Sequence, residues 1–189
     1  MRRSEEKMEE DRLLRDSARR FFEEQRAWSP TGKDNGLAAY HDMGWPGMGL
    51  PEELGGMGAD LSQCLMTVEE GGGVLSPDWL IDDVALPAGL APLSGKGGMG
   101  DLLGQVPSGT VRFALVTGDR RHPPLRLAKN GMDATVTGRS GLVPDALRAT
   151  HLLVCAENAE GEAQLAVIAV DTAGGVHREA YHLMDGRKA

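Results

Sequence analysis

The chain has 189 residues, of which 41% are hydrophobic and 25% charged, so it can form one large globular domain or two small ones. Its formal net charge of −8 excludes nucleic acid and an anionic membrane surface as expected partners, because both are bound through a basic footprint. The opening segment alternates charges, and no apolar run approaches the roughly 20 residues of a membrane span. We therefore expect a cytoplasmic protein.

Neither the cysteines nor the histidines form a recognisable site. Cys64 and Cys155 lie in apolar stretches, lack the spacing of a zinc site and are too few for a disulfide framework. The five histidines are scattered along the chain without metal-ligand spacing. The sequence therefore predicts two buried thiols and no metal site.

The first half of the sequence predicts helices joined by loops rich in Gly and Pro. Between Glu9 and Gln25 the apolar residues recur at i, i+4, i+7 and i+8, which is the stripe of one amphipathic helix. These residues are Leu14, Ala18, Phe21 and Phe22. A short helix is predicted over Asp34–Met43, and the Gly-rich loop that follows, residues 45–59, contains two prolines.

A second amphipathic helix is predicted to begin after Asp60. Asp60 is a typical N-cap, and Gln63 stands where it can close a capping box. The predicted apolar face consists of Leu61, Cys64, Leu65 and Val68. We expect the three glycines at 71–73 to end this helix, because glycine is costly inside a helix.

Two more helical segments are predicted before Thr110. The mostly apolar stretch from Asp78 to Leu93 contains Pro87, which predicts a kinked or divided helix. A last short helix is predicted over Asp101–Val106.

From Thr110 onward the sequence has the two-residue period of strands. The candidate strands are Val111–Val116, Leu125–Ala128, Asp133–Val136, Leu152–Ala156 and Leu165–Val170. Asn130-Gly131 predicts a hairpin between the second and third of them. Helices followed by strands predict an α+β protein. We expect an all-α domain over residues 1–108, followed by a β-barrel-like or β-sandwich domain over residues 109–189.

The loop and helix over residues 44–70 carry a specific family resemblance. Their sequence, GWPGMGLPEELGGMGADLSQCLMTVEE, is similar to the acyl-CoA dehydrogenase family, in which a GW.G...PEE.GG.G loop precedes a helix ending in an EE pair. The opening helix, DRLLRDSARRFFEE, resembles the first helix of that family. The resemblance implies an N-terminal helical domain and much of a middle β domain.

The second half of the chain resembles the flavin-facing segments of the same family. FALVTG is similar to the segment that lies against the flavin ring, and it aligns Thr117 with the family threonine and Gly118 with a usual glutamate. TVTGRSGLVPDALRATHLLVCA is similar to the strand-turn-strand that carries the family's Trp-Ile-Thr motif. The resemblance thus implies FAD as cofactor, with its ring bound by Leu115, Thr117, Leu142, Val143 and Pro144.

Three departures from the family pattern fall on this implied site. Leu142 replaces the motif tryptophan and Pro144 its threonine, which removes a flat packing surface and a hydroxyl donor. The family's Thr-Glu-Pro...Gly-Ser-Asp loop is shortened to residues 117–123.

The activity implied by the resemblance is α,β-dehydrogenation of an acyl-CoA thioester. In that family a carboxylate removes the α-proton while the flavin accepts the β-hydride. The carboxylate belongs to a C-terminal helical domain that these 189 residues do not reach. We therefore expect a truncated chain with no catalytic base of its own and no activity alone. The implied partners are acyl-CoA, an electron acceptor and further chains of the same kind in a homo- or hetero-oligomer.

Two alternatives remain open at this point. One is a non-catalytic partner subunit of a heteromeric acyl-CoA dehydrogenase, and the other is a flavin monooxygenase of the same fold.

Two further sequence features do not indicate a site. The segment SGKGGMGD lacks the spacing of a phosphate-binding loop. The acidic pairs Glu52-Glu53, Glu69-Glu70 and Asp82-Asp83 are predicted to be solvated, because adjacent residues on a helix do not face each other.

Overall fold

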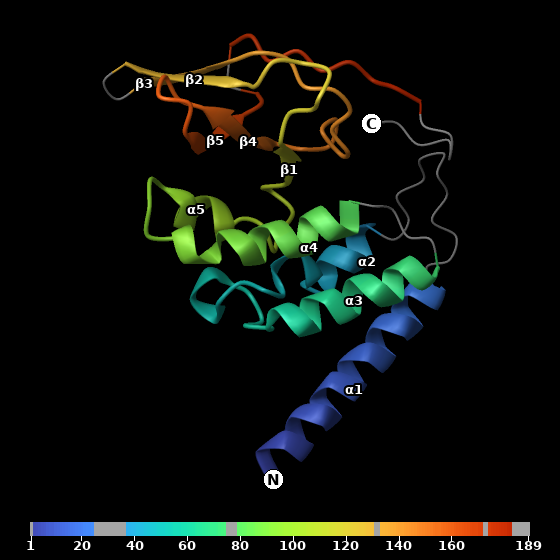
Figure 1. Ribbon diagram of the computed structural model, residues 1–189. Coiled ribbons are helices and arrows are strands. Elements are labelled where there is room, and N and C mark those ends of the chain that lie inside the picture. The colour runs from blue at the N-terminus through green and yellow to red at the C-terminus, as the bar shows by residue number, and fades with distance from the viewer. Residues whose placement is uncertain (1, 25–36, 75–78, 131–132, 172–173, 183–189) are drawn as a thin grey trace. The chain divides into compact units, whose positions relative to one another are not determined.

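The computed structural model describes residues 2–24, 37–74, 79–130, 133–171 and 174–182. The chain divides into two compact units, Met1–Val111 and Arg112–Ala189 (Figure 1). Among the described residues, the first unit contains the α-helices and the second contains the strands. The predicted α+β class is therefore confirmed.

The first unit is a group of helices (Figure 1). Its α-helices are α1 (Arg2–Glu24), α2 (Leu37–Asp42), α3 (Leu61–Gly73), α4 (Trp79–Leu90) and α5 (Met99–Leu103). Its 3₁₀ turns are η1 (Trp45–Gly47), η2 (Glu52–Leu54) and η3 (Ala91–Leu93). Helix α3 contacts both α1 and α4. The start of the predicted helix over Asp34–Met43 lies outside the described residues.

The core of this unit forms around Trp45. The stripe predicted for α1 is confirmed, since Ala18 and Phe22 are buried and Leu14 and Phe21 pack against the same cluster. The rings of Phe21 and Phe22 lie 4.7 and 5.1 Å from the indole of Trp45. The loop that follows α2 thus contributes the largest side chain of the helical core.

The capping box at the start of α3 is present as predicted. The Asp60 carboxylate accepts from the Gln63 N–H at 3.0 Å, and the Gln63 side chain accepts from the Asp60 N–H at 3.1 Å. Both signals are local, because the cap and its partner lie within one turn of helix.

The buried face of α3 differs from the predicted one. Leu61 and Leu65 are 63% and 54% exposed, whereas Cys64, Thr67 and Gly71 are buried. Thr67 is buried without penalty because its hydroxyl donates to the Gln63 carbonyl at 3.2 Å. The prediction considered apolar side chains alone, so the predicted buried face of α3 included two leucines that are exposed to solvent.

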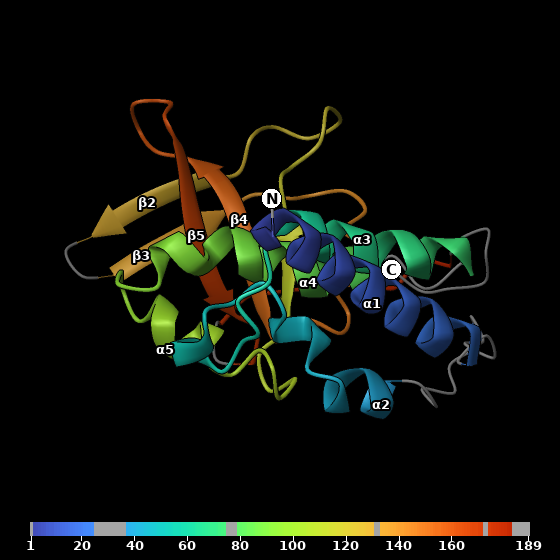
Figure 2. The same cartoon turned by 90° about the horizontal axis from the view of Figure 1, so that it is seen from below.

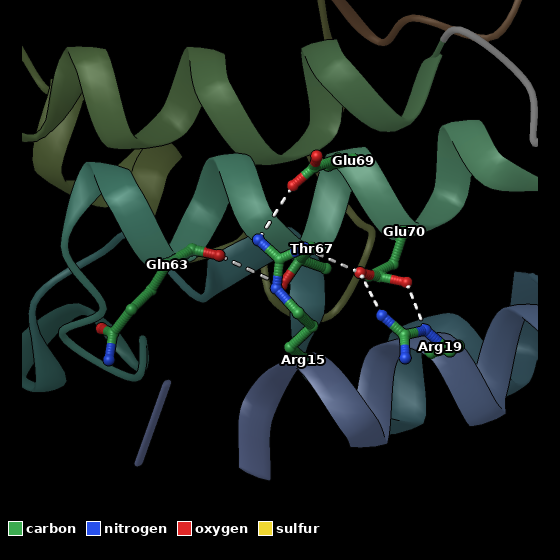
Figure 3. Close-up of polar contacts among 6 residues, drawn as sticks. All are labelled: Arg15, Arg19, Gln63, Thr67, Glu69 and Glu70. Atoms are coloured by element: carbon green, nitrogen blue, oxygen red, sulfur yellow. Dashed lines mark hydrogen bonds and ion pairs between the residues drawn. The ribbon is translucent and has the colours of Figure 1, made fainter. Parts of the chain in front are cut away.

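Helix α3 ends at Gly73, within the glycines predicted to end it, but all three glycines are helical, so the helix does not stop where the first of them begins. Each helical glycine costs about 1 kcal/mol relative to alanine, which tertiary contacts can outweigh. Here the last turns of α3 are held to α1 by Arg15 and Arg19, which pair with Glu69 and Glu70 (Figure 3).

The prediction that Glu69-Glu70 is a solvated pair holds for only one of its members. The Glu69 side chain is 66% exposed, but that of Glu70 is only 11% exposed and contacts two guanidinium groups. Glu70 therefore links α3 to α1, an interaction between distant segments that adjacent-residue geometry does not reveal.

Helix α4 contains Pro87 and ends at Leu90, where η3 begins. The apolar segment is thus divided as predicted, although the division lies beyond the proline rather than at it. Among the described helices, none is long and apolar enough to cross a membrane.

The second unit is one curled, mixed sheet (Figure 2). Its strands are β1 (Phe113–Val116), β2 (Arg126–Asn130), β3 (Asp133–Thr137), β4 (His151–Glu157) and β5 (Ala163–Ala169). Strand β4 pairs in parallel with β1 and, at one residue pair, with β2, and it pairs antiparallel with β5. The predicted hairpin is confirmed by the antiparallel pairing of β2 with β3, while residues 131–132 lie outside the described part.

Alternation along the strands gives the sheet two apolar faces. On one face Val116, Leu127 and Val154 form a buried cluster, and Val136 and Val143 pack against it. Successive side chains of a strand point to opposite faces, so Leu115 and its register partner Leu153 lie on the other face.

Candidate flavin-facing ledge

The residues implied by the resemblance lie mainly in two loops, one after β1 and one after β3. Asp119 connects these loops. Its carboxylate accepts from the backbone N–H groups of Arg121 and His122 at 2.7 and 3.0 Å, and from the N–H of Gly141 in the other loop. The His122 ring lies 2.9 Å away through Nδ1.

Asp119 was not predicted as a site residue. An aspartate that accepts from the N–H groups two and three residues ahead is a typical turn signal, and this local half of its role is visible in the sequence. The contact with Gly141 joins distant segments. A side chain at Gly141 would collide with the Asp119 carboxylate, so glycine permits this close approach.

The backbone conformation at position 118 explains why a glycine stands there in place of the family glutamate. Its φ of 74° lies in the left-handed region, which residues with a Cβ avoid. The shortened loop therefore turns at Gly118, directly before Asp119.

Three of the predicted residues are exposed and lie on these two loops: Thr117, Leu142 and Pro144. We call them the ledge. Leu142 is 57% exposed, and the Thr117 hydroxyl has one long contact, of 3.4 Å with the Gly118 carbonyl, within the described part of the chain. Val143, between the two ledge residues of its loop, turns inward and packs against the cluster that contains Val116. The two predicted segments therefore lie on the same side of the β unit.

Leu115, the fifth predicted residue, lies within β1 itself. Its side chain lies on the opposite face of β1 from Val116, and Val116 is the strand residue that shares a cluster with Val143. Alignment to a motif identifies the strand, but the face of the sheet on which a side chain lies depends on the alternation of side chains along that strand.

The ledge can hold an apolar ring but supplies no general base. The His122 ring and the N–H groups of Arg121 and Gly141 lower the pKa of Asp119 to about 2, so its carboxylate is too weakly basic to remove a carbon-bound proton. Among the described residues, no group of three or more His, Cys, Asp or Glu is placed to hold a metal ion.

Replacing Asp119 by asparagine is expected to remove an acid-dependent part of the stability. Because the folded pKa of about 2 lies below the ordinary value of 3.8, ionised Asp119 stabilises the fold above that value, and this contribution is lost as the pH falls toward 2. Thermal unfolding of both proteins between about pH 2 and pH 7 should show a smaller acid-induced decline for the variant. A carboxyl NMR titration of the native chain with a midpoint near 3.8 would contradict the geometry.

Comparison with known proteins places the fold in a class. Residues 8–80 match the family model for the acyl-CoA dehydrogenase N-terminal domain. No curated protein matched the sequence. A variant of the Tcur3481-Tcur3483 steroid ACAD is 24% identical with a TM-score of 0.81, over 95% of this chain and 53% of that one. The ChsE4-ChsE5 complex from Mycobacterium tuberculosis is 21% identical with a TM-score of 0.77, over 94% and 51%.

A further match lies outside the dehydrogenases by its description. KijD3 in complex with FMN and a dTDP-linked amino-keto sugar is 20% identical with a TM-score of 0.68, over 87% of this chain and 45% of that one. The chain thus spans about half the length of the solved structures it matches.

Helices followed by a curled mixed sheet therefore form the fold shared by acyl-CoA dehydrogenases and their flavin-binding structural relatives. Within that class, the resemblance to the acyl-CoA dehydrogenase family is confirmed by the family model over residues 8–80. The GW.G...PEE.GG.G loop lies inside the matched residues.

Proposed function

We propose that this chain supplies the flavin-facing part of an FAD-dependent acyl-CoA dehydrogenase that introduces an α,β double bond into an acyl-CoA. The ledge carries this proposal: Thr117, Leu142 and Pro144 are exposed together on two loops that Asp119 joins. The dehydrogenase fold supports it. The proposal includes a cytoplasmic location and a division into a helical domain, 1–108, and a β domain, 109–189.

The ledge fits the flavin ring in part. Leu142 and Pro144 offer exposed apolar contacts, and Thr117 offers a weakly engaged hydroxyl to a ring oxygen or nitrogen. A flavin held there would supply the hydride acceptor. The residues of this chain orient the ring and shield one face from water, and we assign the base and most contacts of the dinucleotide tail to segments outside these 189 residues. Acyl-CoA and an electron acceptor are the further partners of the proposed reaction.

A second candidate function is a partner subunit whose own flavin site has lapsed. Leu142 and Pro144 lack the aromatic surface and hydroxyl of the family motif. Two of the structures with this fold are described by pairs of chains, Tcur3481-Tcur3483 and ChsE4-ChsE5. These observations favour a hetero-oligomer in which another chain completes or replaces the site.

Substituting Leu142→Trp is expected to tighten flavin binding about tenfold, which corresponds to about 1.4 kcal/mol, because an aromatic surface would return to the ledge. Lumiflavin, FMN and FAD should bind the native 189-residue chain with similarly weak affinity, since only the ring is contacted. Flavin fluorescence titration measures all three, and Lys129→Gln, on exposed β2, is the control.

The same samples test catalysis with octanoyl-CoA and an artificial electron acceptor. We expect no turnover from the chain alone, because a positioned general acid or base typically contributes about 10²–10⁴-fold. Stoichiometric FAD with turnover would overturn our assignment of the base. Failure of every flavin to bind, even with Leu142→Trp, would remove the flavin-facing role and leave the lapsed partner subunit.

A further inference from the structure

Strand β5 has an open edge, because within the described part of the chain it pairs with β4 alone. Its seven residues, Ala163–Ala169, include no charged residue and no proline, and its register with β4 is continuous. All seven are at least partly exposed, and Leu165 is 45% exposed. Folded proteins usually protect such an edge with charges, proline or a bulge, since its N–H and C=O groups can pair with another strand. β5 has none of these protections within its length.

The register with β4 determines which backbone groups of β5 face the open side. The Val170 N–H donates to Thr150 at 2.9 Å and the Asn158 N–H donates to Glu162 at 3.0 Å, so the even-numbered residues of β5 face β4. Because the hydrogen-bonding direction alternates along a strand, the odd-numbered residues point their N–H and C=O groups outward. These residues are Ala163, Leu165, Val167 and Ala169.

This outward row of groups is complementary to itself. If a second β5 lies antiparallel with Ala166 opposite Ala166, then Leu165 lies opposite Val167, and Ala163 lies opposite Ala169. Each outward N–H then meets an outward C=O of the other copy, as in any antiparallel ladder. The central pair, where side chains approach most closely, consists of two alanines, and apolar pairs flank it. A shift by one residue would turn the hydrogen-bonding groups away from each other.

The charges next to β5 lie only beyond its ends, where Glu162 precedes the strand and Asp171 follows it by one residue. In the antiparallel pair, Glu162 of one copy comes near Asp171 of the other. Both are exposed, and Glu162 accepts from the Asn158 amide at 3.0 Å. Exposed like charges interact weakly and are screened by salt. Pairing through β5 should therefore become stronger as salt is added.

We propose that β5 is a homodimer interface, at which two copies of this chain pair antiparallel about Ala166 and join their sheets. A second copy fits this edge because one strand supplies both complementary rows of groups. Interfaces smaller than about 1,200 Å² are weak, so we expect a reversible dimer with a Kd of roughly 10–100 µM. The proposal goes beyond the proposed function, because no ledge residue belongs to β5 and no flavin takes part.

Sedimentation velocity of the 189-residue chain without flavin, at concentrations on both sides of this Kd, measures the association. We expect a monomer–dimer equilibrium that shifts toward the dimer as NaCl is added. Val167→Pro removes one outward N–H but no hydrogen bond to β4, a position where an edge strand tolerates proline, and it should weaken the dimer at least tenfold. Val167→Thr keeps the N–H and the branched shape, so its dimer should match the native one.

Amide hydrogen exchange locates the interface in the native chain, without any substitution. The N–H groups of Leu165 and Val167 should exchange fast in dilute solution and become protected as the protein concentration rises. The Ala166 N–H, which faces β4, should be protected throughout, which also shows that the strand is folded.

Three results would each overturn the proposal. A monomer at every concentration would exclude a second copy as the occupant of this edge. Equal dimerisation of Val167→Pro and the native chain would place the interface elsewhere. Protection of Leu165 and Val167 that does not depend on concentration would mean that the edge is covered within a single chain. Because no flavin is present, these results are independent of the outcome at the ledge.

Discussion

Replacing Gly56 by alanine is expected to destabilise the helical unit by about 3 kcal/mol or more, at or above the upper end of typical overpacking costs. A Cβ at this position would collide with the carbonyl groups of Leu50 and Gly47, which are backbone atoms. These carbonyls cannot move aside, because the Gly47 and Leu50 oxygens accept from Met57 and Gly58 at 3.4 and 2.8 Å. Urea unfolding followed by Trp fluorescence measures the loss.

Gly72→Ala is the matched control. Gly72 lies near the end of α3, is exposed, and has no atom within 4 Å of an added Cβ. The same chemical change should therefore stabilise the helix by up to about 1 kcal/mol. Equal effects of the two substitutions would show that the close packing of the 44–60 loop does not limit stability.

Features set by neighbours in the sequence were predictable. The stripe that includes Ala18 and Phe22 and the capping box of Asp60 and Gln63 depend on spacings within one or two turns of helix. The hairpin of β2 and β3 follows from two short strand patterns around a turn signal.

The errors in α3 have one physical origin, the packing of distant segments. Thr67 can be buried because its hydroxyl donates to the Gln63 carbonyl within the helix, whereas Leu65 lies on the exposed side of α3. The helix passes Gly71 because contacts with α1 and burial outweigh local propensity. The pattern of apolar residues in the sequence includes neither the hydrogen bond of the Thr67 hydroxyl nor the contacts of α3 with α1.

In the candidate site, too, some features could be predicted from the sequence and others depend on contacts between distant segments. Motif resemblance pointed to both loops of the ledge and to Leu115, but it did not show that Val116 rather than Leu115 shares a side-chain cluster with Val143, which depends on strand alternation. The contact of Asp119 with Gly141 joins the loops through a hydrogen bond between segments far apart in sequence. Family motifs specify loop conformation, whereas this link depends on the particular shortened loop of this chain.

Glu70→Ala is expected to destabilise the helical unit by about 2 kcal/mol, less than the 3–5 kcal/mol typical of fully buried pairs. Arg19 binds the Glu70 carboxylate at 2.9 Å through Nε, and Arg15 lies at 3.1 Å (Figure 3). The substitution removes the contacts of Glu70 with Arg15 and Arg19 that link α3 to α1. Glu69→Ala removes a 66% exposed partner of Arg15 and should cost at most about 1 kcal/mol.

The pH dependence distinguishes this ion-pair cluster from ordinary packing. Hydrogen bonds from Arg19, and then the charges of Arg19 and Arg15, lower the pKa of Glu70 from its ordinary value of 4.5. A lowered pKa means that ionised Glu70 stabilises the fold above that value, and that this stabilisation disappears as the pH falls through the folded-state pKa. Glu70→Gln keeps the size of the side chain but cannot ionise, so its unfolding free energy should lie below the native one at neutral pH and approach it in acid. Urea unfolding at several pH values measures both curves. Parallel curves would mean that Glu70 acts by filling space, whereas convergence in acid means that its charge joins the two helices.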